Sequence, residues 1–256
     1  MSGLLVAAIG PEMVLATFLL FCRIGACMLV IPGFSSDRVA MRIRLLMAVA
    51  STFAMAPMLL PIMRQAMPDL GPATTVRLIA GELYIGLLIG LMGRAFIAAL
   101  EMIGTLMSMA IGMNNIPGVP VGGGETMPPL ASLLSVTATA MIFITDQHQE
   151  VFRGLAQSYM RLPPSLAIQP LEGLEQFADQ LSVAFFLALR IGSPFIVYSV
   201  AVNFAIGITN RLTPQIPVYF ISMPLIIIGG LYFLFVVISD FMRIFLDGYF
   251  SWLQYG

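Results

Sequence analysis

The chain has 256 residues, of which 59% are hydrophobic and 10% charged, and several apolar runs are longer than a soluble core helix needs to be. This composition predicts an integral membrane protein. The net charge of -1, the single His and the lack of a basic run argue against a nucleic-acid partner, which would need a clustered basic face.

The first apolar run covers residues 13–31, contains Arg23 and ends at Pro32-Gly33. We predict a membrane-spanning helix here. The hydrophilic segment after it carries Arg38, Arg42 and Arg44 against a single acid, Asp37. By the positive-inside tendency this segment is predicted to be cytoplasmic.

The second and third apolar runs cover residues 45–63 and 76–100. Pro57 and Pro61 in the second run are expected to kink its helix or to end it early. The third run has more charge than a lipid-exposed helix usually carries. Its charged residues are Arg77, Glu82, Arg94 and, directly after it, Glu101.

Two short apolar segments flank a Gly/Pro-rich stretch at residues 111–129. They cover residues 102–111 and 130–145, and each is shorter than the ~20 residues that a helix needs to cross a bilayer. We therefore predict a broken, re-entrant hairpin. Its loop at residues 109–124 should face a cavity or a partner, because lipid cannot satisfy free backbone N–H and C=O groups. The alternative is an ordinary external loop.

Residues 146–180 form the longest polar stretch and are predicted to fold as two amphipathic helices around a turn at Pro163-Pro164. Gln169-Pro170 is expected to open the second helix, because Pro is tolerated in a first helical turn. The last two apolar runs cover residues 181–208 and 218–246 and are joined by a tight turn.

Three possible metal ligands, Asp146, His148 and Glu150, alternate at the start of the polar stretch. On a strand they would share a face, but a helix is favoured here, and residues two apart on a helix diverge. We therefore expect Asp146 to cap a helix and expect neither a metal site nor a cofactor.

Enzyme motifs are missing from the sequence. It has no G-x-S-x-G, no H-E-x-x-H and no G-x-x-x-x-G-K. Gly122, Gly123 and Gly124 lead into Glu125, whose charge would repel a phosphate. We predict that the chain is not an enzyme and folds as a single all-helical unit over residues 1–256.

Several charged residues are predicted to lie within the membrane, where each costs about 2.5 to 3.5 kcal/mol on insertion scales. They are Arg23, Glu82, Arg94, Glu101 and Arg190. One interpretation is the ion path of a secondary transporter, with Glu82, Arg94 and Arg190 along it. The other is pairing inside a multi-subunit bundle.

The sequence contains 19 Met residues, several of them beside the predicted hairpin loop. Flexible, polarizable Met side chains could seal a pore when it is empty and deform around varied passengers. Met102, Met107 and Met127 are the predicted gasket, and Met109 and Met113 belong to the loop. The alternative is apolar filling of a core.

Four motifs carry a resemblance to a known family. They contain Asn203, Gly207, Asn210, Arg211, Pro214, Gln215 and Pro224; Arg23 and Pro32; Arg42 and Arg44; and Glu82, Gly86 and Gly90. In order and spacing they resemble the FliR family, the R subunits of the flagellar type III export gate, and their virulence-secretion counterparts. Two departures are Met107 and Met109, where the family often has Gln, and Gln147, where it has Gly.

The resemblance implies a noncatalytic subunit that assembles with several P-like and Q-like membrane proteins, beside other export-apparatus membrane proteins, into a closed helical channel for unfolded export substrates. It implies a place in the bacterial inner membrane, at the flagellar basal body; an injectisome gate is the alternative. The loop would contribute to a plug. We further predict that Arg211 and Gln215 hold the last two helices together or against a neighbour. The predicted plug residues are Met109, Met113, Asn114, Asn115, Ile116, Pro117, Gly118, Gly122, Gly123 and Gly124.

Overall fold

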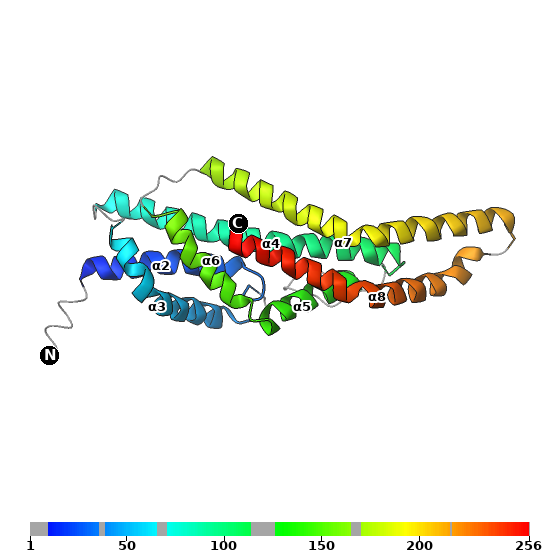
Figure 1. Cartoon of the computed structure of the whole chain (residues 1–256), viewed down its shortest axis with the longest axis horizontal. Helices are drawn as coiled ribbons and strands as arrows, with labels where there is room; N and C mark the ends of the chain where they lie inside the picture. The colour runs from blue at the N-terminus through cyan, green and yellow to red at the C-terminus, as the bar shows by residue number, and fades with distance from the viewer. Residues whose placement is uncertain are drawn as a thin grey trace. The chain divides into compact units, whose positions relative to one another are not determined.

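The computed structural model describes residues 10–35, 39–65, 71–113, 126–164, 170–215 and 217–255. Within these ranges every regular element is an α-helix (Figure 1), which confirms the predicted all-α fold. The helices are α2 (Pro11–Val30), α3 (Met41–Gln65), α4 (Pro72–Ala110), α5 (Pro129–Ile144), α6 (His148–Arg161), α7 (Pro170–Leu212) and α8 (Val218–Tyr255).

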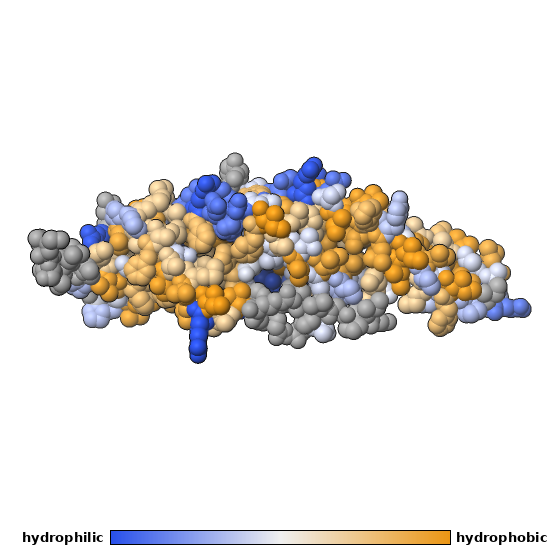
Figure 2. Space-filling view, turned by 90° about the horizontal axis from the view of Figure 1, so that it is seen from below, coloured by the Kyte–Doolittle hydropathy of each residue, from blue (hydrophilic) through white to orange (hydrophobic). Residues whose placement is uncertain are grey.

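Five of these helices, α2, α3, α4, α7 and α8, are long and apolar enough to cross a membrane. The shorter α5 and α6 pass the same test only as a pair broken between them. The face of the molecule in Figure 2 is accordingly covered mostly by apolar side chains. The chain is an all-α polytopic membrane protein.

The described residues pack as two compact units. The first comprises Met1–Arg94 and Asp146–Gln180, and the second comprises Ala95–Thr145 and Leu181–Gly256. Within the first unit, α2, α3 and α6 share a core in which Leu19, Leu59 and Tyr159 are fully buried. The single unit predicted for residues 1–256 stays a prediction.

The end of α2 follows from Pro32. A residue that precedes Pro is pushed out of the helical region towards extended backbone. Ile31 accordingly has φ −62° and ψ 138°, and its amide donates the last hydrogen bond, to the Cys27 carbonyl. Gly33 then takes φ 90°, which a side chain would disfavour. The predicted helix end at Pro32-Gly33 is therefore confirmed.

Prolines inside the other apolar runs do not end their helices. Helix α3 continues through Pro57 and Pro61, so the early end considered for it is wrong. Helix α7 continues through Pro194, whose missing amide leaves the Arg190 carbonyl without its helical donor. The Ser193 hydroxyl donates to that carbonyl at 2.9 Å. Such local replacements are how spanning helices tolerate proline.

Three predicted boundaries are wrong. Residues 102–110 are not a separate hairpin arm, because they complete the 39-residue helix α4. The second amphipathic helix, which does open at Pro170, continues without a break into α7. Residues 209–212 are the end of α7 rather than part of a turn. Each of these positions is continuous helix because nothing in the local sequence stops the i to i−4 bonding.

Candidate functional site

A buried ion pair joins α2 to α4 in the first unit. Arg23 donates from Nε to Glu82 Oε2 at 2.7 Å and from Nη2 to Oε1 at 2.9 Å, so both carboxylate oxygens are engaged. The side chains are 0% and 1% exposed. This bidentate geometry compensates two charges that would otherwise be costly inside a spanning helix pair.

Helix α6 completes the surroundings of Arg23. The guanidinium donates from Nη1 to the Ser158 hydroxyl at 3.1 Å and from Nη2 to the Leu162 carbonyl at 3.0 Å. Its Cζ atom lies 3.9 Å from the centre of the Tyr159 ring. Because Leu162 is the C-cap of α6, Arg23 satisfies one of the carbonyls that every helix end leaves free. One side chain therefore ties three helices together.

Two glycines on α4 make this pairing possible. A Cβ at Gly86 would overlap the Arg23 carbonyl oxygen, and one at Gly90 would lie 2.9 Å from the Cys27 carbonyl oxygen. Gly86 and Gly90 are one turn apart and one turn beyond Glu82, so they lie on the same face of α4. This small-xxx-small spacing lets two membrane helices approach closely.

The pairing bears on the transporter alternative. Glu82 is occupied by Arg23 and offers no free carboxylate to a passing ion or proton. Arg190 is exposed on α7, and Arg94 is partly buried. Glu101 is buried and accepts a hydrogen bond from Ser135 Oγ at 3.0 Å. These contacts favour the interpretation in which the intramembrane charges hold helices together.

The end of α4, in the second unit, forms a Schellman motif. Gly112 has φ +80°, the Met113 amide donates to the Ser108 carbonyl at 2.8 Å, and the Gly112 amide donates to the Met109 carbonyl at 3.1 Å. This pair of bonds is the standard way to close a helix with a left-handed glycine. The helix therefore stops at a defined point, and because it runs to Ala110, the predicted start of the loop at residue 109 is wrong by two residues.

The first residues of α5 lie directly against this helix end. The Leu130 amide donates to Ser108 Oγ at 3.3 Å, and the Ser108 hydroxyl donates to the Gly104 carbonyl at 3.0 Å. A Cβ at Gly104 would lie 2.6 Å from the Ala131 Cα. The end of α4 and the start of α5 are therefore joined to one another. We call these contacts of Gly104, Ser108, Gly112, Leu130 and Ala131 the loop root.

The loop root gives a first prediction. Replacing Gly112 with Ala should destabilise the end of α4, because a left-handed backbone costs a residue with a Cβ roughly 1–2 kcal/mol. A Cβ at Gly112 would meet no atom within 4 Å, so steric overlap would not contribute. Hydrogen exchange of the Met113 amide should become faster. Unchanged exchange at Met113 would show that the glycine is not needed there.

The predicted Met and plug residues are placed only in part. Met107 is 1% exposed and lines a cavity of about 260 Å³ between α4 and α7, whereas Met109, which lines the same cavity, is 52% exposed. Met102, Met113 and Met127 are partly buried. Their gasket role stays a prediction. Asn114, Asn115, Ile116, Pro117, Gly118, Gly122, Gly123 and Gly124 lie outside the described residues.

The expected cap at Asp146 is wrong. Gln147 is the N-cap of α6, no side chain caps this helix, and Asp146 lies before it with φ 57°. Asp is one of the few residues that adopt this backbone conformation readily, so the residue forms a turn rather than a cap. Among the described residues no group of three or more His, Cys, Asp or Glu side chains could hold a metal ion.

The family-motif residues fall into two groups. Arg23, Glu82 and Pro32 are buried in the first unit. The others are exposed, except Arg44, which is partly buried and donates to the Val39 carbonyl at 3.0 Å. The exposed residues are Arg42, Asn203, Asn210, Arg211, Pro214 and Gln215. Among the described residues, Arg211 forms no hydrogen bond or ion pair, and its predicted role with Gln215 stays a prediction.

Sequence reasoning missed Ser158, Tyr159, Ser108 and Gly104. Ser158 and Tyr159 sit on the buried face of α6, which the amphipathic pattern of residues 146–161 could have identified. Gly104 and Ser108 are four residues apart, another pair of small residues at helical spacing. No sequence signal connects them to Leu130 or Ala131.

Comparison with known proteins agrees with the resemblance seen in the motifs. The family described as "Bacterial export proteins, family 1" matches residues 14–251. The flagellar biosynthetic protein FliR of Caulobacter vibrioides is 26% identical over 90% of this chain and 91% of its own length. FliR of Escherichia coli K12 is 25% identical over 82% and 78%.

A secretion protein is also similar. The secretion system apparatus protein SsaT of Salmonella typhimurium is 27% identical over 58% of each chain. The family match covers nearly the whole chain, and the FliR similarity extends through both compact units. The chain therefore belongs to family 1 of the bacterial export proteins, among relatives that include the flagellar biosynthetic proteins FliR.

Proposed function

We propose that this chain is a noncatalytic structural subunit of a closed helical channel in the flagellar type III export gate. Its partners would be P-like and Q-like membrane subunits and other export-apparatus proteins in the bacterial inner membrane. The passengers would be unfolded flagellar proteins. The observation that carries the proposal is the loop root, which joins the end of α4 to the first residues of α5, the described residues on either side of the segment that contains the predicted plug.

The loop root suits a plug because a gate needs a fixed hinge. Ser108 and Gly112 hold the end of α4, and Leu130 holds the start of α5. The segment between them can then change its conformation without loosening the helices on either side. Its Gly and Pro residues, including Gly122 to Gly124, would let it move aside while Met109 and Met113 close on the passing chain.

The surface of the second unit is suited to assembly with partner subunits. Long stretches of α7 and α8 expose large apolar side chains, among them Phe204 at 69%, Phe220 at 78% and Phe235 at 77%. Such surface needs lipid or another apolar helix against it. We infer that partner subunits cover part of it.

Deleting residues 118–124 should make the assembled gate leak small ions, because the loop would then be too short to fill the lumen. The measurement is membrane conductance in cells or bilayers that contain the complete complex. A matched control replaces Gly122, Gly123 and Gly124 with Ser, which keeps the loop length and should leave the gate sealed. An intact complex with unchanged conductance after the deletion would contradict the plug role.

Arg211 should contribute to assembly. It lies in the last turn of α7, exposed and without a partner among the described residues, so its guanidinium is available to a neighbouring subunit. Replacing Arg211 with Ala should lower the yield of purified complex several-fold, while Arg243→Ala, another exposed Arg, should not. A normal yield of an actively exporting complex from the Arg211 variant would refute this role.

A gate of a virulence injectisome is the second candidate, favoured by the similarity to SsaT. That match covers 58% of this chain, whereas the Caulobacter FliR match covers 90%. The flagellar assignment is therefore preferred. Loss of motility without loss of effector secretion, after deletion of the gene, would distinguish the two systems.

A further inference from the structure

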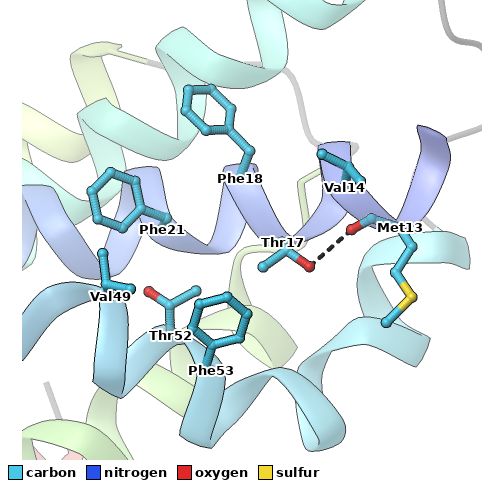
Figure 3. Close-up of a pocket in the computed structure, with 8 residues that line it drawn as sticks. All are labelled: Met13, Val14, Thr17, Phe18, Phe21, Val49, Thr52 and Phe53. Atoms are coloured by element: carbon cyan, nitrogen blue, oxygen red, sulfur yellow. Dashed lines mark hydrogen bonds between the residues drawn. The ribbon is translucent and has the colours of Figure 1, made fainter. Parts of the chain in front are cut away.

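An apolar cavity lies between α2 and α3 in the first unit. Its volume is about 400 Å³, within the range of ligand-binding sites. Figure 3 shows its lining, with Val49, Thr52 and Phe53 on α3 beneath α2. The α2 side of the lining is Met13, Val14, Thr17, Phe18 and Phe21.

The cavity offers no hydrogen bond from its side-chain hydroxyls to an occupant. The Thr17 hydroxyl donates to the Met13 carbonyl at 2.8 Å, and the Thr52 hydroxyl donates to the Ala48 carbonyl at 2.7 Å. The remaining lining is aliphatic, aromatic or thioether. Neither hydroxyl is therefore a donor to an occupant, and the mostly apolar lining favours an occupant that is apolar where it enters the cavity.

The cavity opens to the side of two helices that can span a membrane. Val14 is 58% exposed, Phe18 47% and Phe53 65%. Both α2 and α3 are candidate spans by length and composition. The opening is thus continuous with surface that a bilayer would cover with acyl chains.

An exposed stripe leads from the cavity to a positive charge. Arg42, Leu46, Val49 and Phe53 follow one another on α3 at steps of four, three and four residues, so they share one face. Leu46 is 68% exposed and Val49 37%. The eleven residue steps from Arg42 to Phe53 rise about 16 Å along a helix. Half of the hydrocarbon core of a bilayer is about 15 Å.

The charge at the end of this stripe is exposed. Arg42 is exposed and forms no hydrogen bond or ion pair with any other described residue. Its guanidinium suits a phosphate, which it can bind through two parallel N–H donors. The predicted cytoplasmic location of residues 38–44 would put it at the level of the lipid headgroups.

We propose that α2 and α3 form a specific phospholipid site. The phosphate of the headgroup binds Arg42, one acyl chain lies along Leu46 and Val49, and its end fills the cavity beside Phe53. The charge of Arg42 matches the phosphate, the apolar stripe matches the acyl chain, and the cavity matches the end of that chain. Covering of the same groove by an apolar helix of another subunit is the competing possibility.

The test measures lipid binding to the full-length protein in mild detergent by native mass spectrometry. The probes are phosphatidylglycerol and a diacylglycerol with the same acyl chains. We expect one phosphatidylglycerol to bind on the order of tenfold more tightly than the diacylglycerol, since only the former carries a phosphate. In Arg42→Gln this preference should vanish, and in the matched control Arg77→Gln it should persist.

A second variant tests the cavity. The Trp side chain of Val49→Trp should occupy the space of the acyl chain and weaken binding of both probes. Arg42→Gln should weaken only the binding of phosphatidylglycerol. Because Arg42 is exposed, Arg42→Gln should fold normally. The test therefore stays decisive even if Val49→Trp fails to fold. Equal binding of both probes to the wild type, or an unchanged preference in Arg42→Gln, would overturn the proposal. So would cross-linking of Phe53 to a partner subunit in every copy of the native complex.

Discussion

Replacing Arg23 with Leu should destabilise the protein more than any other single substitution considered for this chain. The change leaves Glu82 buried at 1% exposure with neither oxygen bound to Arg23 and removes the donors to Ser158 and to the Leu162 carbonyl. Removing one partner of a buried ion pair costs about 3–5 kcal/mol. We expect a lower thermal unfolding temperature in detergent and less protein in the membrane.

Two further variants separate the effect of an unpaired buried charge from the effect of lost side-chain packing. In Arg23→Leu/Glu82→Leu no buried charge is left unpaired, and well-packed apolar replacements of buried ion pairs are often neutral. The double variant should therefore recover much of the lost stability. Arg77→Leu removes an exposed Arg from α4 and should change little. Equal losses in the single and double Arg23 variants would contradict the account of the pair.

Replacing Gly86 with Ala should give the second largest effect. The new Cβ would overlap the Arg23 carbonyl oxygen, a backbone atom that cannot rotate away, so α2 and α4 must separate. Overpacking alone costs about 1–3 kcal/mol, and the separation also lengthens the bonds between Arg23 and Glu82. The protein should unfold at a lower temperature in detergent.

The control for this substitution lies on the facing helix. A Cβ at Gly25 would meet only the Phe21 ring, at 3.8 Å, which is ordinary contact. Gly25→Ala should therefore be neutral or slightly stabilising, because Ala is the better helix former. If Gly86→Ala were as well tolerated as Gly25→Ala, close approach of α2 and α4 would not be essential.

Hydropathy located the helices because a spanning helix must be long and apolar. It placed their ends less well. Pro57 and Pro61 predict a kink or an early helix end, yet α3 passes through both. Helices in apolar surroundings survive proline when a neighbouring group satisfies the freed carbonyl, as Ser193 does for Arg190 in α7. Such replacements depend on three-dimensional contacts and leave no clear mark in a hydropathy profile.

The charged part of the site was partly predictable. Arg23 and Glu82 were identified because charges inside apolar runs are costly and therefore tend to be functional or paired. Their pairing was not identified, because it joins residues 59 apart in the chain. The spacing of Gly86 and Gly90 was the available signal, since small residues one turn apart mark the faces where helices meet.

The loop root shows the limit of sequence reasoning. The Gly/Pro-rich composition predicts a loop at residues 109–124, but the contact between the helices on either side of it comes from Ser108 and Leu130. Neither residue type is unusual, and their partnership exists only in the fold. Gly112 alone could have been predicted, since glycine is the usual residue after a helix end.

The measurement that tests the central claim most directly is affinity purification of this protein from native membranes in mild detergent, followed by mass spectrometry of the proteins that remain bound. The export-gate account predicts a stable complex with P-like and Q-like membrane subunits. Purification of the chain alone, or only as a homo-oligomer, would contradict it.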